Sequence, residues 1–147
     1  WWGAGGGVSF IQPEYTVVQL LKAHWPATLV LAAAVLLVAV GVALPVGVLA
    51  AVYAPRWPDR WAVGLSVVLY AAPSFVLGPL LMIGLGVWAG WLPLAGADTG
   101  WHLVLPALTL GLGMSAILIR LLRATLLDLR AAPFLQTSRA KGATAGR

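Results

Sequence analysis

The strongest constraint on this chain is a set of three long stretches without a charged residue. They cover 23–55, 61–97 and 99–119, which are 33, 37 and 21 residues long. Each exceeds the ~20 apolar residues that cross a bilayer as a helix. Because lipid offers no partner to unpaired backbone groups, an open sheet is excluded at that depth. The sequence therefore predicts an all-α membrane protein, a polytopic bundle of transmembrane helices.

Composition excludes several other classes. Of 147 residues, 61% are hydrophobic and 9% are charged, against roughly a quarter charged in soluble domains. Without cysteine there is no disulfide framework or thiolate metal site, and two histidines 78 residues apart begin no metal cluster. The net charge of +5 is confined to short segments rather than spread over a basic face. No cofactor, metal or nucleic-acid partner is indicated.

We place three spans at about 27–52, 61–91 and 102–119, between an extracytoplasmic segment (1–26) and a cytoplasmic loop (120–147). The middle span is too long to cross straight, since 31 residues reach roughly 46 Å against a hydrocarbon core of ~30 Å. Pro73 lacks an amide proton and its ring collides with the preceding turn. We therefore expect a kink at Ala72, Pro73 and Ser74, with the piece before it along the inner interface.

Orientation follows from the basic residues, which are in excess in cytoplasmic loops. The 120–147 segment carries six of them and the loop 55–60 carries two, whereas 1–26 has only Lys22. This count places both basic segments in the cytoplasm. Tryptophan, which prefers the headgroup zone, agrees with these ends. Six lie near predicted span ends, namely Trp25, Trp57, Trp61, Trp88, Trp91 and Trp101.

Small residues four apart occur in the predicted spans, where they allow close helix packing. The pairs are Ala43 and Gly47, Gly86 and Gly90, and Gly111 and Ser115. Small residues are common in any membrane helix, so the sequence leaves open whether these pairs form contacts.

Catalytic chemistry has little support in the sequence. No Asp, Glu, Lys or Arg lies inside the predicted spans, so an ion pump or proton-coupled carrier is disfavoured and energy is expected from outside the segment. An intramembrane serine protease would need Ser74 and His102 on facing helices, yet a helix kink and the outer interface account for these residues. The run Gly3 to Gly7 lacks the Lys-Ser or Lys-Thr of a phosphate loop.

The third predicted helix should continue past Ile119 until Pro133 ends it. Pro133 is also suited to the first position of a new helix, and Gly142 to its end. A short helix over 133–141 is therefore expected. It fits either of two roles: a peg for a groove on a soluble partner, or a basic segment held by anionic lipid. Composition leaves both open.

This segment resembles the cytoplasmic loop of inner-membrane permease subunits of binding-protein-dependent ABC transporters, in the dipeptide, oligopeptide and nickel branch. The family's Glu-Ala-Ala, three residues, Gly motif corresponds to Gln136, Thr137, Ser138, Arg139, Ala140, Lys141 and Gly142. The Arg-Ala-Lys-Gly part matches closely, while Gln136–Ser138 depart from the general motif. Five further stretches fit in order: Pro26–Leu29, Leu44–Ala51, Pro73–Phe75, Gly90–Pro93 and Leu105–Gly111.

The resemblance implies a bacterial inner-membrane, multi-pass permease subunit that is not itself an enzyme. Its implied partners are ABC ATPase subunits, a second permease subunit, an extracytoplasmic solute-binding protein and membrane lipid. Phe134 and Gln136–Gly142 would form a coupling helix in a groove of the ATPase. The family would have one span before Trp1 and further spans after Arg147. The alternative is a membrane-embedded scaffold protein whose basic tail binds lipid.

The orientation can be tested by labelling, because the chain has no cysteine of its own. We expect Asp98→Cys and Ser138→Cys to react with an impermeant thiol reagent from opposite faces of the membrane. Labelling of both from outside in intact cells would contradict the predicted topology.

Overall fold

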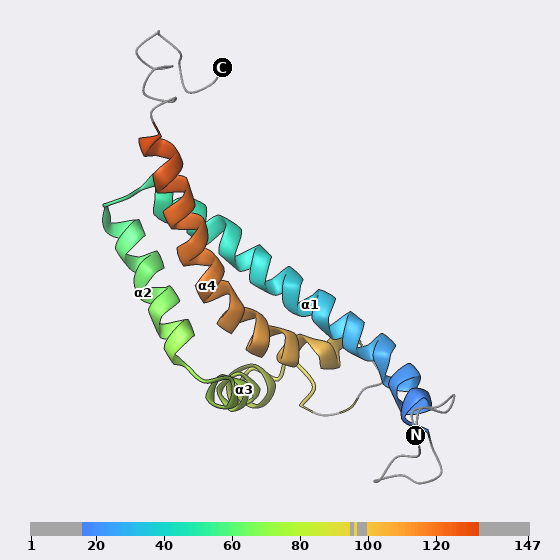
Figure 1. Ribbon diagram of the computed structural model, residues 1–147. Coiled ribbons are helices and arrows are strands. Elements are labelled where there is room, and N and C mark those ends of the chain that lie inside the picture. The colour runs from blue at the N-terminus through green and yellow to red at the C-terminus, as the bar shows by residue number, and fades with distance from the viewer. Residues whose placement is uncertain (1–15, 95, 97–99, 133–147) are drawn as a thin grey trace.

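The computed structural model describes residues 16–94, 96 and 100–132, and these form a bundle of helices (Figure 1). The elements in chain order are α1 (Val17–Val52), α2 (Trp57–Ala71), α3 (Ser74–Leu81), the π-helical η1 (Met82–Trp88), the 3₁₀ turn η2 (Gly100–Leu103) and α4 (Val104–Ala131). α1 and α2 lie along α4, and α3 turns across them (Figure 1). The expected all-α class is confirmed.

α1 is longer than the span predicted within it. It begins at Val17 and ends at Val52, the residue at which the predicted span ends. A reciprocal capping box starts the helix: the Gln19 amide donates to the Thr16 hydroxyl, and the Thr16 amide donates to Oε1 of Gln19. Pro26 then lies inside the helix. At ~1.5 Å per residue, 36 residues reach about 54 Å, more than one bilayer core.

The middle apolar stretch is broken at Pro73, as predicted. α2 ends at Ala71, Ala72 and Pro73 are extended, and α3 begins at Ser74. Proline disfavours helical geometry at the residue before it, which explains the extended Ala72. The two halves meet at 103°. The prediction for the first half was wrong, because α2 runs beside α4 and the segment after the break is the one that turns across (Figure 1).

Two of the three small-residue pairs lie in the contact between α1 and α4. Ala43, Gly47, Gly111 and Ser115 are all buried. A Cβ on Gly111 would lie 2.7 Å from Cβ of Val38, and one on Gly47 would lie 3.0 Å from Cδ2 of Leu122. The helices therefore approach to a distance that only small residues allow.

The third pair serves the chain turn instead. A Cβ on Gly86 would meet Leu94 of the following segment rather than another helix. Gly90 has φ of +64°, a conformation that favours glycine, and nothing within 4 Å of its Cβ position. Within the described residues, Gly86 and Gly90 therefore belong to the chain turn after η1 rather than to a contact between helices.

The register of the same contact shows that α1 and α4 are parallel. Gly111 faces Val35 and Val38, and Gly47 faces Ile119 and Leu122, so both helices advance in the same direction. Between two parallel helices the chain must return, and the bent pair of α2 with α3–η1 makes that return. α1 and α4 are each long and apolar enough to span a membrane. The bent pair meets the same criterion when α2 and α3–η1 are counted as one span. This arrangement agrees with three spans.

The α1–α4 contact makes a matched pair of glycine substitutions informative. Gly111→Ala places a methyl group against the Val38 branch point, so we expect a loss of about 1–3 kcal/mol of stability from overpacking. Gly113→Ala on the same helix meets nothing within 4 Å and changes backbone entropy equally, so it is the control. Denaturant unfolding of the purified protein in detergent compares them, and equal stabilities would refute the close approach.

Candidate functional site at the charged end of the bundle

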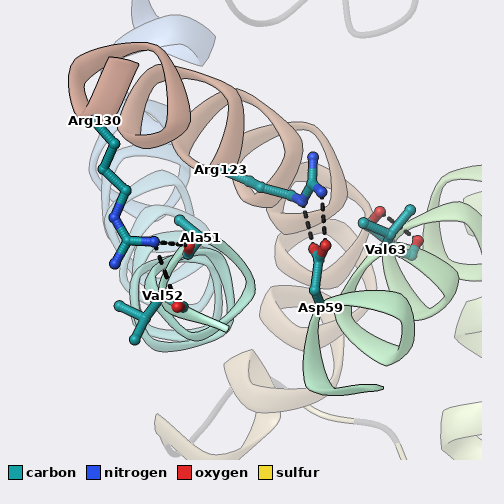
Figure 2. Close-up of polar contacts among 7 residues, drawn as sticks. Ala51, Val52, Asp59, Val63, Arg123 and Arg130 are labelled. Carbon is teal, nitrogen blue, oxygen red and sulfur yellow. Dashed lines mark hydrogen bonds and ion pairs between the residues drawn. The ribbon is translucent and has the colours of Figure 1, made fainter. Parts of the chain in front are cut away.

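Apart from Lys22 near the start of α1, the charged residues of the described helices lie toward the end where α1 passes into α2 and where α4 finishes. Figure 2 shows three of them, Asp59, Arg123 and Arg130. We call Ala51–Asp59, the connection from the last residues of α1 to the first turn of α2, the corner. Arg123 and Arg130 reach it from α4. Sequences that are more than 60 residues apart therefore meet here.

Asp59 and Arg123 form a bidentate ion pair. Nε of Arg123 donates to Oδ1 at 2.5 Å, and Nη2 donates to Oδ2 at 2.7 Å. Asp59 is only 4% exposed, although it lies in the first turn of α2, and the Arg123 side chain is 29% exposed. Planar two-bond pairing of this kind fixes orientation as well as distance. It joins the start of α2 to α4.

Arg130 joins the end of α1 to the same helix. Its Nη1 donates to the carbonyl of Ala51 at 2.6 Å and, at 3.4 Å, to that of Val52. The last carbonyls of a helix lack partners within the helix and carry its partial negative charge. The last turn of α1 has no basic residue of its own, so α4 supplies the cation.

The two arginines continue the packing stripe of α4. Ala116, Arg123 and Arg130 are spaced by seven residues, which places them on one face of a helix. Ala116 is fully buried in the apolar part of the bundle. The face that packs against α1 and α2 through small residues therefore changes to arginine at this end.

A third basic residue of α4 contacts α2 on the surface. The guanidinium carbon of Arg120 lies 4.5 Å from the ring centroid of Tyr70. Both side chains are exposed, where such cation–π contacts contribute ~0.5–1 kcal/mol. This contact supports the packing of α2 without burying a charge.

An apolar groove of about 730 Å³ lies between α1 and α2 near the corner. Its lining is aliphatic and aromatic except for Arg60. A polar solute requires convergent hydrogen-bonding groups, and the lining of this groove lacks them. We therefore do not assign the solute path to this groove.

The described residues end at Ala132, directly before the segment expected to bind the ATPase. α4 continues to Ala131, and Ala132 is extended with φ −62° and ψ 135°. This is the conformation that a following proline favours, so the expected end of the helix before Pro133 is confirmed. Phe134 and Gln136–Gly142 lie outside the described residues, as do Gly3–Gly7 and Asp98.

Sequence reasoning missed the pairing of Asp59. The basic residues at this end indicate the orientation of the chain, but the sequence around Arg60 gives no sign that Asp59 is buried. Two clues were present: Trp57-Pro58-Asp59 fits the first turn of a helix, and Arg123 and Arg130 share one helix face.

Comparison with known proteins agrees with this architecture. Residues 43–147 match the model of the family described as "Binding-protein-dependent transport system inner membrane component". The chain is 43% identical over 96 residues to the glutathione transport system permease protein GsiC of Escherichia coli strain K12, covering 65% of this chain and 31% of that protein. For the protein of the same name in Salmonella typhimurium strain LT2 the values are 41%, 99 residues, 67% and 32%. The chain thus spans about a third of the length of these relatives.

Helices of this length and polarity, with a basic end, define a polytopic α-helical membrane protein. The chain belongs to the family of binding-protein-dependent transport system inner membrane components. Family membership confirms the inner-membrane location and favours a non-catalytic transport component over the protease considered for Ser74 and His102.

The ion pair can be tested by removing its charge. We expect Asp59→Asn to destabilise the protein by about 1–3 kcal/mol, because Arg123 loses its charged partner in a buried contact. The ~3–5 kcal/mol of a fully buried pair is not reached, since Arg123 is 29% exposed and can be hydrated.

The matched control for this test is Asp128→Asn, which removes the same charge from an exposed position on α4. It should stay within ~0.5 kcal/mol of the original protein. Denaturant unfolding in detergent measures both, and equal losses would show that the Asp59 contact contributes no stability.

Proposed function

We propose that the protein acts as a permease subunit of an ATP-driven importer, with the α1–α4 bundle forming part of its transmembrane region. The family match over 43–147 carries this proposal. The helices supply no nucleotide-binding loop or catalytic constellation within the described residues. Energy then enters through partner subunits that hydrolyse ATP.

The proposed cargo is a peptide-like solute. Glutathione is the solute in the names of the relatives from Escherichia coli and Salmonella typhimurium. It is a small peptide with charged groups at both ends, so it is the first compound to test. Dipeptides, longer peptides and nickel remain the comparison set, because the resemblance covers importers of all three.

The proposed partners are ABC ATPase subunits, a second permease subunit, an extracytoplasmic solute-binding protein and surrounding lipid. The family description itself refers to a system that depends on a binding protein. We assign the cytoplasmic side to the corner and to the segment 133–147, from the eight basic residues at this end. The extracytoplasmic side is then that of 1–26.

We assign ATPase coupling to Phe134, Gln136, Thr137, Ser138, Arg139, Ala140, Lys141 and Gly142. Support comes from the close match of Arg139–Gly142 to the family's loop motif and from the position of α4. The described part of α4 is held to both α1 and α2 within its last nine residues, from Arg123 to Ala131. A segment that follows it directly is well placed to act on the bundle.

The coupling role is tested with Phe134→Ala and Gly142→Val in the full-length protein. Aromatic anchors often contribute ~2 kcal/mol or more to small interfaces. A side chain with a Cβ resists the left-handed conformation that ends many helices. We expect both changes to reduce ATPase co-purification or ATP-dependent glutathione uptake while membrane insertion is unchanged.

The scaffold alternative makes the opposite prediction for the same segment. If the tail binds lipid, Arg139→Glu combined with Lys141→Glu should abolish binding of the tail to anionic lipid. Phe134→Ala should then leave assembly and uptake almost unchanged. Unchanged assembly and uptake in both Phe134→Ala and Gly142→Val would refute the coupling assignment.

A further inference from the structure

The last turns of α4 are a stiff continuation of the bundle. From Met114 to Ala132 the chain contains neither glycine nor proline, the residues at which helices bend most readily. Arg123 lies eight residues before the helix end, about 12 Å along the axis. A displacement applied at the end of α4 is therefore carried along the helix to Arg123.

This stiff end of α4 contacts the corner at two separate points. Arg123 holds the carboxylate of Asp59 at the start of α2, and Arg130 holds the carbonyls of Ala51 and Val52 at the end of α1 (Figure 2). Both arginines lie on one helix face, seven residues apart. The bidentate ion pair orients only the start of α2, whereas the two contacts together restrain the end of α1 and the start of α2 at once.

At its far end from the corner, α2 stops at a break between helices that can act as a hinge. Ala72 and Pro73 break the helix, and the segment after them is turned by 103°. Gly78 of α3 lies against α4, where a Cβ would be 3.6 Å from Cγ2 of Thr109. A shift of α2 at its start would therefore change the angle at Pro73 while α3 stays in contact with α4.

From these observations we infer that Arg123, Arg130 and Asp59 are positioning residues that make the α1–α2 corner move together with the end of α4. We call the three the corner clamp. The inference rests on the proposed function, because the displacement would originate in the ATPase that binds the segment after α4. The clamp would transmit this displacement to both α1 and α2, and through α2 to the break at Pro73.

The experiment uses the complete transporter, with ATPase subunits and binding protein, in liposomes and with tritiated glutathione as the probe. The clamp variants are Arg123→Gln and Arg130→Gln. Arg120→Gln is the matched control, since it removes the same charge from α4 one turn before Arg123 and loses only the exposed contact with Tyr70, outside the corner. We expect the clamp variants to hydrolyse roughly 2- to 30-fold more ATP per glutathione imported, a range typical of mutations along coupling networks. Arg120→Gln should match the original protein.

Two conservative variants keep the test decisive if a glutamine variant fails to assemble. Arg123→Lys retains a positive charge next to Asp59 but cannot form two parallel bonds, so it should show the same effect at smaller size. Arg130→Lys can still donate to the carbonyls of Ala51 and Val52, so it should largely restore coupling. A defect of equal size in Arg120→Gln would indicate a general charge effect and overturn the inference.

Hydrogen exchange separates failure of the clamp from failure of the proposed function. In the original transporter, ATP binding should change amide exchange at the corner and in the segment after α4. In Arg123→Gln and Arg130→Gln the change should persist in that segment and disappear at the corner. If ATP binding still changes amide exchange at the corner in these two variants, the clamp is refuted, even if import is ATP-driven. An absence of glutathione import refutes the substrate proposal, and the exchange result still decides the clamp.

Discussion

The arrangement of this chain depends on the close approach of α1 and α4. At Gly111 and Gly47 the helices come so near that a Cβ would contact the facing side chain. In lipid, where burial of apolar groups gives little net drive between helices, packing of this kind supplies much of the association energy. Because the two helices are parallel, it also forces the intervening chain to return across the bundle. The bent pair of α2 and α3–η1 follows from that requirement.

The same helix face has a second function at the charged end. Small residues allow α4 to approach α1 along the apolar part, and arginines replace them where the corner lies. Asp59 is buried there with both carboxylate oxygens occupied. The charges therefore stabilise a defined geometry at the end from which the proposed coupling segment leaves. For the proposed coupling such a connection matters, because a loosely held α4 would absorb a displacement instead of transmitting it.

The resemblance and the family match agree on the class of protein. The resemblance rests on short stretches such as Arg139–Gly142, whereas the family model matches 43–147 and so includes only the end of α1. The groove beside α1 and α2 is apolar, so solute selection is not explained by it. Coupling and solute choice are thus separate questions for this fold.

The sequence by itself determined the membrane class, the break at Pro73 and the end of α4 before Pro133. These follow from local chemistry: uncharged length, a missing amide proton and the restriction that proline places on its neighbour. Only the tertiary structure decided that α3, not α2, turns across, that Gly86 and Gly90 serve a turn, and that Asp59 is buried against Arg123. Each of these depends on which residue faces which across 60 or more positions or around a turn. Composition and spacing along the chain do not contain that information.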